Sequence, residues 1–243
     1  MEKVQTRPVR IILRAMSDHG PLGDPGSVEI EVLNDQRVAP DGAFLWVRKL
    51  DLVNRYPDGA RSRPYAYFIV ERVLLDAVCV VLFKRVAGEV LVLLRSQLRP
   101  PLWFRKEYDV PLPAEGTGAV QWEVPAGLIE QGERGEAGIF GRAQSETLEE
   151  VGLRLPIARF VTLGHATSLS PGLIAEKLHF VCAEVHDSDP MQEALGDGHA
   201  VEERSVSRFV PFAEALRALA SGLLHDVKTE VALARLRDLL SLR

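Results

Sequence analysis

Two long apolar runs separated by a tight turn constrain the fold of this chain more than any other feature. The runs are AVCVVLFKR, residues 77–85, and EVLVLLRSQ, residues 89–97, and a Val-Ala-Gly segment joins them. Valine-rich and leucine-rich runs of this length around a glycine turn predict a β-hairpin that is buried on at least one face. Other elements must therefore cover this hairpin.

The rest of the chain mixes strand-like and helix-like segments without a regular alternation. Strands are predicted within residues 9–15, 28–33, 43–59, 64–73, 121–127, 159–166, 177–185 and 207–212. Helices are predicted from about residue 136 to Gly152, at 213–220 and at about 227–242. The stretch that follows Arg99-Pro100-Pro101, up to about Gly118, is rich in proline and glycine and is expected to be irregular. This order favours an α+β fold in which helices flank a mixed sheet.

Composition and charge limit the class of partner. Hydrophobic residues make up 47% of the chain, which is ample for a packed core, and the formal net charge is -5. An acidic chain has no general attraction to nucleic acid or anionic membrane, so a phosphate ligand needs a local device such as a metal ion. The N-terminus lacks a signal-peptide pattern and no apolar run reaches about 18 residues. We therefore expect a cytoplasmic protein with no nucleic-acid and no membrane partner.

Three glutamates near the end of the central predicted helix form the strongest chemical signal. Glu146, Glu149 and Glu150 are three and four residues apart, so their carboxylates share one helix face. A solvated acidic face is the plain alternative. However, a loop containing Gly127 and Gly132 precedes the helix, and glycine lets backbone groups approach a ligand closely. Carboxylate oxygens are the ligands that Mg²⁺ or Mn²⁺ prefers, so the pattern points to a metal site.

This pattern resembles the Nudix family, whose signature is G-x5-E-x7-R-E-U-x-E-E-x-G-U, where U is a bulky apolar residue. Residues 127–133, GLIEQGE, match its opening, and residues 146–153, ETLEEVGL, match its close. Eleven residues separate Glu133 from Ser145 where the signature has seven, and Ser145 replaces the arginine. Thr147 also replaces an apolar residue.

Those departures have local consequences. In the family the arginine pairs with the first glutamate of the box, and Arg142, one helical turn before the glutamates, is a candidate substitute. Four extra residues are about one helical turn, so they can lengthen the helix at its start without rotating the glutamate face.

Shorter motifs extend the resemblance to the subgroup that acts on ADP-ribose and other nucleotide sugars. They are, in order, RSQLRP at 95–100, WEVPAG at 122–127, Ser-Pro-Gly at 170–172 and HDVKTEVALARL at 225–236. The resemblance implies a Nudix α/β/α sandwich with a mixed sheet over residues 75–243. It also implies that the β-rich region 1–74 supports a homodimer and the substrate.

Residue roles follow from the same resemblance. The backbone carbonyl of Ala126 and the carboxylates of Glu146, Glu149 and Glu150 would bind Mg²⁺ or Mn²⁺. Arg99 would meet the phosphate or terminal ribose of the substrate, and Glu123 would lie beside it. Without the resemblance, Arg99 could be an ordinary surface arginine and Glu123 an outward strand residue.

The general base in this subgroup often lies on a loop before a late strand, which here is the segment GHAVEERSVSRFVP. Glu203 is the first candidate and Glu202 the second, and a solvated loop is the alternative for both. Such a base could deprotonate a water that the cation has made more acidic.

The function implied is hydrolysis of the diphosphate of ADP-ribose or a related nucleoside-diphosphate sugar to a nucleoside monophosphate and a sugar phosphate. A dinucleoside polyphosphate is an alternative substrate. A different alternative is a nucleotide-sensing or interaction module with a Nudix fold and weak catalysis, which Ser145 and the longer loop suggest. Cys79 and Cys182 lie in apolar runs and are expected to be inert core thiols.

Overall fold

The computed structural model describes residues 28–38, 43–111, 118–194, 196, 198 and 200–241. The chain divides into two compact units, and the N-terminal unit runs to Val73 and also includes Ser170–Ala175. The second unit holds Leu74–Leu169 and everything from Glu176. The strand predicted at residues 9–15 lies outside the described residues.

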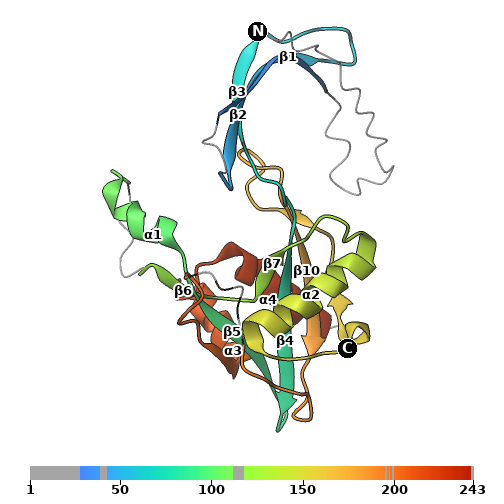
Figure 1. Ribbon diagram of the computed structural model, residues 1–243, viewed down its shortest axis with the longest axis vertical. Helices are drawn as coiled ribbons and strands as arrows, with labels where there is room; N and C mark the ends of the chain where they lie inside the picture. Colours follow the sequence, from blue (N-terminus) through green and yellow to red (C-terminus); the bar gives the residue numbers. More distant parts are fainter. Residues whose placement is uncertain are drawn as a thin grey trace. The chain divides into compact units, whose positions relative to one another are not determined.

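The N-terminal unit contains a three-stranded antiparallel sheet in the order β1-β2-β3 (Figure 1). Its strands are β1 (Glu29–Val38), β2 (Trp46–Arg55) and β3 (Tyr65–Glu71). The segment Ser170–Ala175 is fixed to β3 by two hydrogen bonds. Val70 N–H donates to the Leu173 carbonyl at 2.9 Å, and the Tyr67 hydroxyl donates to the Gly172 carbonyl at 2.8 Å.

The second unit is built on a mixed sheet whose main path runs β11-β5-β4-β10-β8. These strands are β4 (Ala77–Val86), β5 (Glu89–Leu98), β8 (Val161–Thr162), β10 (Lys177–Glu184) and β11 (Ser207–Pro211). Three short strands join it: β6 (Val120–Glu123) pairs with β5, β7 (Ala126–Leu128) with β4 and β9 (Thr167–Ser168) with β10. The pair β4-β10 is parallel and the others are antiparallel. The predicted hairpin is the centre of this sheet.

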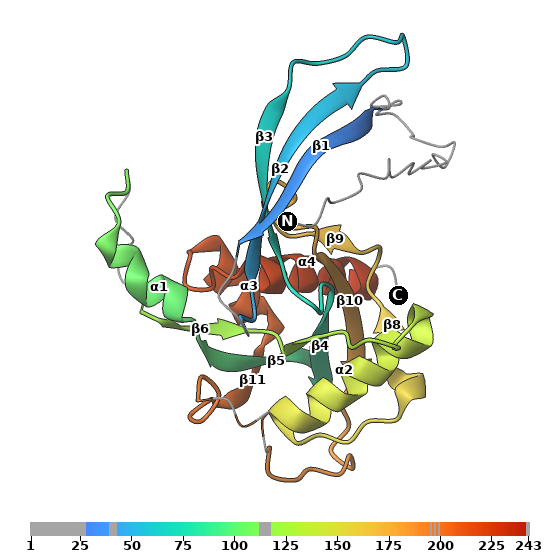
Figure 2. The same ribbon diagram turned by 45° about the horizontal axis from the view of Figure 1, so that its top comes forward.

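Helices cover both faces of the sheet, as Figure 2 shows for α2 and α4 on opposite sides of β4 and β10. Helix α2 is Gly135–Val151, α3 is Phe212–Ala220 and α4 is Val227–Ser241. Alternate residues of β4 point to opposite faces. Val78, Val80 and Leu82 pack in the α2 layer, whereas Cys79, Val81 and Phe83 pack in the α3 and α4 layer. The predicted α+β class, a mixed sheet in an α/β/α sandwich, is confirmed.

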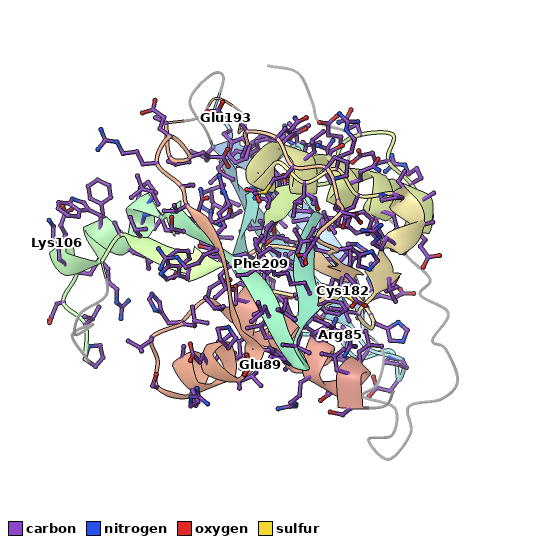
Figure 3. All side chains as sticks on the ribbon, turned by 90° about the horizontal axis from the view of Figure 1, so that it is seen from below. Arg85, Glu89, Lys106, Cys182, Glu193 and Phe209 are labelled. Atoms are coloured by element: carbon purple, nitrogen blue, oxygen red, sulfur yellow. The ribbon has the colours of Figure 1, made fainter. Side chains whose placement is uncertain are left out.

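Two local predictions were wrong. The stretch after Arg99 is not wholly irregular, because it contains α1 (Pro100–Phe104) and a 3-10 turn, η2 (Arg105–Glu107). Prolines at the first helical positions need no hydrogen-bond donor, so they are compatible with a helix start. In Figure 3 Lys106 marks this projecting segment, and its ammonium lies 3.5 Å from the centre of the Trp103 ring.

The strand predicted at 159–166 is reduced to β8. The 3-10 turn η3 (Ile157–Arg159) takes its first residue, and Gly164 has a φ of 73°, a left-handed conformation that ends the extended run.

Helix α2 has the length and end that the sequence predicts. It starts two residues after Glu133, so the four additional residues are part of the helix. Gly152 ends it with a φ of 78°, and its N–H donates to the Leu148 carbonyl at 2.9 Å. No helix in the part of the chain that the structure describes is long and apolar enough to span a membrane.

Candidate active site

Gly127, in the opening segment of the box, makes room for Glu146, in its closing segment. A Cβ on Gly127 would lie 1.7 Å from Oε1 of Glu146 and 1.9 Å from its Cδ. The Glu146 carboxylate therefore occupies the space that any other side chain at position 127 would fill. The buried Glu146 carboxylate therefore lies in close contact with the backbone of β7.

Arg142 fixes the loop that leads into helix α2. Its guanidinium donates two hydrogen bonds to the Glu133 carboxylate, at 3.2 and 3.1 Å, and forms an ion pair with Glu130 at 2.7 Å. The same guanidinium lies 3.6 Å from Glu146. The side chain proposed as a substitute for the missing arginine thus pairs with the first glutamate of the box.

The Glu150 carboxylate is anchored on both oxygens. Oε1 accepts a hydrogen bond from Arg95 at 2.9 Å, and Oε2 accepts one from the backbone N–H of Ala126 at 3.1 Å. Glu146 and Glu150 are one helical turn apart on α2. Both therefore flank the Ala126–Gly127 backbone, which also holds the carbonyl predicted as a ligand.

The late loop contributes one further carboxylate. An oxygen of Glu202 lies 3.3 Å from Nη2 of Arg95, and 14% of the Glu202 side chain is exposed. Its charge also acts on Glu146 and Glu150. Glu203, the first candidate for the base, is exposed on the same loop. The structure thus brings the second candidate, rather than the first, to the carboxylate cluster.

Burial and mutual repulsion raise the pKa values of the two central carboxylates. Burial, followed by repulsion from Glu149, raises the pKa of Glu146 to about 7. Burial also raises the pKa of Glu150 to about 8, although Arg95 opposes the rise, and repulsion from Glu146 and Glu202 adds to it. The cationic side chains of the protein therefore do not fully offset the negative charge of Glu146 and Glu150.

An additional cation would supply the missing compensation. Among the described residues, no three carboxylate, imidazole or thiol side chains already converge to enclose a metal ion. The donors nonetheless suit a hard divalent cation, because they are all oxygens: the carboxylates of Glu146, Glu149 and Glu150 and the carbonyl of Ala126. By donor chemistry and charge, these residues fit Mg²⁺ or Mn²⁺.

A second charged group adjoins the carboxylate cluster. The Arg99 guanidinium donates two hydrogen bonds to the Glu123 carboxylate, at 2.7 and 2.5 Å, and Lys228 donates to the same carboxylate at 2.9 Å. Burial acts to raise the pKa of Glu123, but Arg99 and Lys228 outweigh it and lower that pKa to about 2. Arg99 remains 41% exposed, so it can still meet a ligand.

Arg95, Gln97 and Arg99 line one small cavity together with Glu123 and Glu150. Side chains two residues apart point to the same face of a strand, so this polar series continues the face of β5 on which Leu93 packs. Arg99 and Glu123 lie side by side as the sequence predicts, and the cavity joins them to the carboxylates.

Sequence reasoning assigned no role to Arg95 or to Lys228. Both lie in motifs that the sequence makes visible, Arg95 at the start of RSQLRP and Lys228 in HDVKTE. The available signal was a charged residue at an inward position of a strand, since Arg95 follows Leu93 in the two-residue alternation of β5.

Comparisons with known proteins find similar chains among curated proteins and solved structures. No family model matches the chain. The GDP-mannose pyrophosphatase of Salmonella paratyphi B is 32% identical over 142 residues, which are 58% of this chain and 64% of that protein. The protein of the same name from Salmonella typhimurium is 34% identical over 90 residues, which are 37% of this chain and 44% of that protein. These matches are consistent with the resemblance of the two box segments to the Nudix signature.

A solved structure shares the fold of this chain. The structure described as an ADP compounds hydrolase superposes with a TM-score of 0.61 and 21% identity, over 87% of this chain and 94% of that one. At this identity the likeness concerns the fold alone. The chain spans 64% of the length of the first curated relative that it matches.

Proposed function

We propose that this chain is a Nudix hydrolase that splits the diphosphate linkage of ADP-ribose or a related nucleoside-diphosphate sugar with the help of a divalent metal. The observation that carries the proposal is the pair of buried carboxylates, Glu146 and Glu150, that flank the Ala126–Gly127 backbone. The names of the relatives, GDP-mannose pyrophosphatase and ADP compounds hydrolase, support this class of substrate.

Metal binding is assigned to Glu146, Glu149, Glu150 and the carbonyl of Ala126. A bound Mg²⁺ or Mn²⁺ supplies positive charge that offsets the diphosphate and makes a water more acidic. The protein's own contribution is to hold the carboxylates in place, through the Ala126 N–H on Glu150 and Arg142 on the box loop.

Glu202 is the better candidate for the general base. It is largely buried beside Arg95, next to the carboxylates, whereas Glu203 is exposed. A carboxylate at Glu202 can accept the proton of the attacking water. Attack at one phosphorus then breaks the diphosphate bridge and releases a nucleoside monophosphate and a sugar phosphate.

The substrate is assigned to the polar face of β5 and the residues after it. Arg99 has guanidinium surface left over after its bonds to Glu123, and an arginine suits phosphate oxygens. Glu123 is held by Arg99 and Lys228, so it fixes the direction of the Arg99 side chain. Catalysis of this kind depends mainly on positioning and electrostatics.

The domain roles complete the proposal. Residues 1–74 are assigned to support of the substrate and of a homodimer, and residues 75–243 to catalysis. The three-stranded sheet exposes apolar side chains such as Ile30, Val47 and Phe68, which is consistent with an interface. Sedimentation analysis of the full chain tests the dimer.

A substrate panel tests the proposal. The purified full chain is incubated with Mg²⁺, Mn²⁺ or a chelator, and with ADP-ribose, nucleotide sugars including GDP-mannose, and dinucleoside polyphosphates. We expect monophosphate release from a nucleotide sugar that stops with the chelator. Faster turnover of a dinucleoside polyphosphate than of any nucleotide sugar would make the dinucleoside polyphosphates the substrate class instead. Measurable binding with no turnover of any compound would favour the sensing module and reject the proposal.

A further inference from the structure

Arg95 is the most deeply buried cation of the carboxylate cluster. Its side chain is 5% exposed, and it lies on β5 opposite Glu123 of β6 and Ser207 of β11. Nη1 donates to Glu150 at 2.9 Å and also to Gln97, and Nη2 lies 3.3 Å from Glu202. One guanidinium thus joins the metal-binding helix to the loop before β11.

The hydrogen bonds of Arg95 are incomplete on one side. Its Nε is buried and has no partner within the described part of the chain. A guanidinium held only for stability would be expected to satisfy all of its donors, because an unpaired buried donor is costly. Its two ion-pair partners, Glu150 and Glu202, come from different segments of the chain. This arrangement is that of a counter-ion placed between two carboxylates.

The other two nearby guanidinium groups are paired with other carboxylates. Arg99 donates its two hydrogen bonds to Glu123. Arg142 makes its closest contacts with Glu130 and Glu133, at 2.7 and 3.1 Å, and reaches Glu146 only at 3.6 Å. Arg95 is therefore the principal fixed positive charge on the Glu150 side of the cluster.

We propose that Arg95 is a resident counter-cation that a divalent metal must displace from Glu150, so that this guanidinium sets the metal affinity of the site. The inference rests on the proposed function, because it takes Glu150 to be a metal ligand. It goes beyond that function by making metal affinity a property of β5 as well as of helix α2.

Charge and geometry both support displacement. A divalent cation on the Glu150 carboxylate and a guanidinium on the same carboxylate repel each other strongly in a site of low dielectric constant. Glu202 offers Arg95 a second partner, at 3.3 Å, to which it can remain paired when Glu150 binds metal. The arginine therefore lowers metal affinity without being left unpaired in the metal-bound form.

The test is direct Mn²⁺ binding to the full-length protein, measured by electron paramagnetic resonance of free Mn²⁺ without substrate. The variants are Arg95→Met and Arg95→Gln, which remove the charge, and Arg95→Lys, which keeps it. Arg85→Met, at the far end of strand β4, is a control for loss of one positive charge. A pH of about 8.5 limits competition from protons on the carboxylates.

We expect both neutral variants to bind Mn²⁺ at least ~10-fold more tightly than the wild type, because the repulsion is removed. Arg95→Lys and the control should stay within about threefold of the wild-type affinity, since each leaves the charge at Glu150 in place. Thermal unfolding with and without Mn²⁺ identifies a variant that fails to fold. The gentler Arg95→Gln substitution then carries the comparison.

The outcomes separate this inference from the proposed function. Unchanged or weaker Mn²⁺ binding by folded neutral variants overturns the inference and leaves the metal site intact. No Mn²⁺ binding by the wild type or by any variant overturns both. Binding by the neutral variants alone supports the inference in its strongest form, in which Arg95 blocks the site.

Discussion

Gly127→Ala tests the geometry of the site at a single atom. The added Cβ would lie 1.7 Å from Oε1 of Glu146, whereas ordinary contacts begin near 3.4 Å. The carboxylate must therefore move by about 1.5 Å or more to restore an ordinary contact. Because it is the end of a flexible side chain, it can rotate away without unfolding the sheet or the helix. The substitution is thus expected to act on the site and not on the fold.

The size of the effect follows from the tolerance of metal ligands. Distances between a metal ion and its protein ligands vary by only about 0.2 Å, so a carboxylate displaced by about 1.5 Å is lost as a ligand. We expect Mn²⁺ affinity to fall ~10- to 100-fold, which is about 1.4–2.8 kcal/mol. The free energy of unfolding without metal should fall by only about 0.5–1.5 kcal/mol, the cost of a strained rotamer. Isothermal titration with Mn²⁺ and urea unfolding measure the two quantities.

Gly141→Ala is the matched control, because no heavy atom lies within 4 Å of the Cβ it would add in helix α2. It should stabilise the helix by about 0.5–1 kcal/mol and leave Mn²⁺ affinity unchanged. Wild-type Mn²⁺ affinity in folded Gly127→Ala would refute the reasoning, since Glu146 could then not be a ligand in the position described.

Other predictions concern the brace that Arg142 forms with Glu130 and Glu133, the charged group around Glu123, and the two thiols. Arg142→Met should lower the free energy of unfolding in urea by about 1–3 kcal/mol, less than for a fully buried pair because Glu133 is partly exposed; no change would argue against the brace. Glu123 has a pKa lowered from 4.5 to about 2. Its stabilisation of ~3 kcal/mol should be complete above pH 4.5 and be lost as the pH falls through about 2. In acid urea titrations the stability gap to Glu123→Gln should therefore close, and a gap that widens would contradict this. Burial raises the pKa of Cys79 to about 12, and Cys182 is also buried, so a thiol-reactive disulfide should label neither in the folded protein and both in urea.

The sequence predicted those parts of the site that depend on local periodicity. The spacing of Glu146 and Glu150 fixes their common face once the segment is a helix, and Gly152 fixes where that helix ends. The length of a helical turn also predicted that four extra residues would lengthen α2 and leave its glutamate face unrotated. Arg142 could be suggested as a brace because it lies one turn before Glu146.

Features that depend on long-range contacts were less accessible. Glu202 and Arg95 are far apart in sequence, and only the folded loop before β11 brings them to 3.3 Å. A charged loop gives no periodic signal, so the sequence offered no physical basis for ranking Glu203 ahead of Glu202. Arg95 was missed for a different reason, because a buried arginine is exceptional unless it is paired, and its partners lie on other segments. The cytoplasmic location remains a prediction from the sequence.

The role of the helix glutamates is the central claim, and the kcat/KM of matched variants tests it most directly. Glu146→Gln and Glu150→Gln remove one charge each with little change in shape, and Glu136→Gln does the same at an exposed position in the first turn of α2. With Mg²⁺ and the best nucleotide sugar of the panel, we predict a loss of kcat/KM on the order of 100-fold or more for each of the first two. Glu136→Gln should stay within about twofold of the wild type. Wild-type kcat/KM in Glu150→Gln would contradict the account.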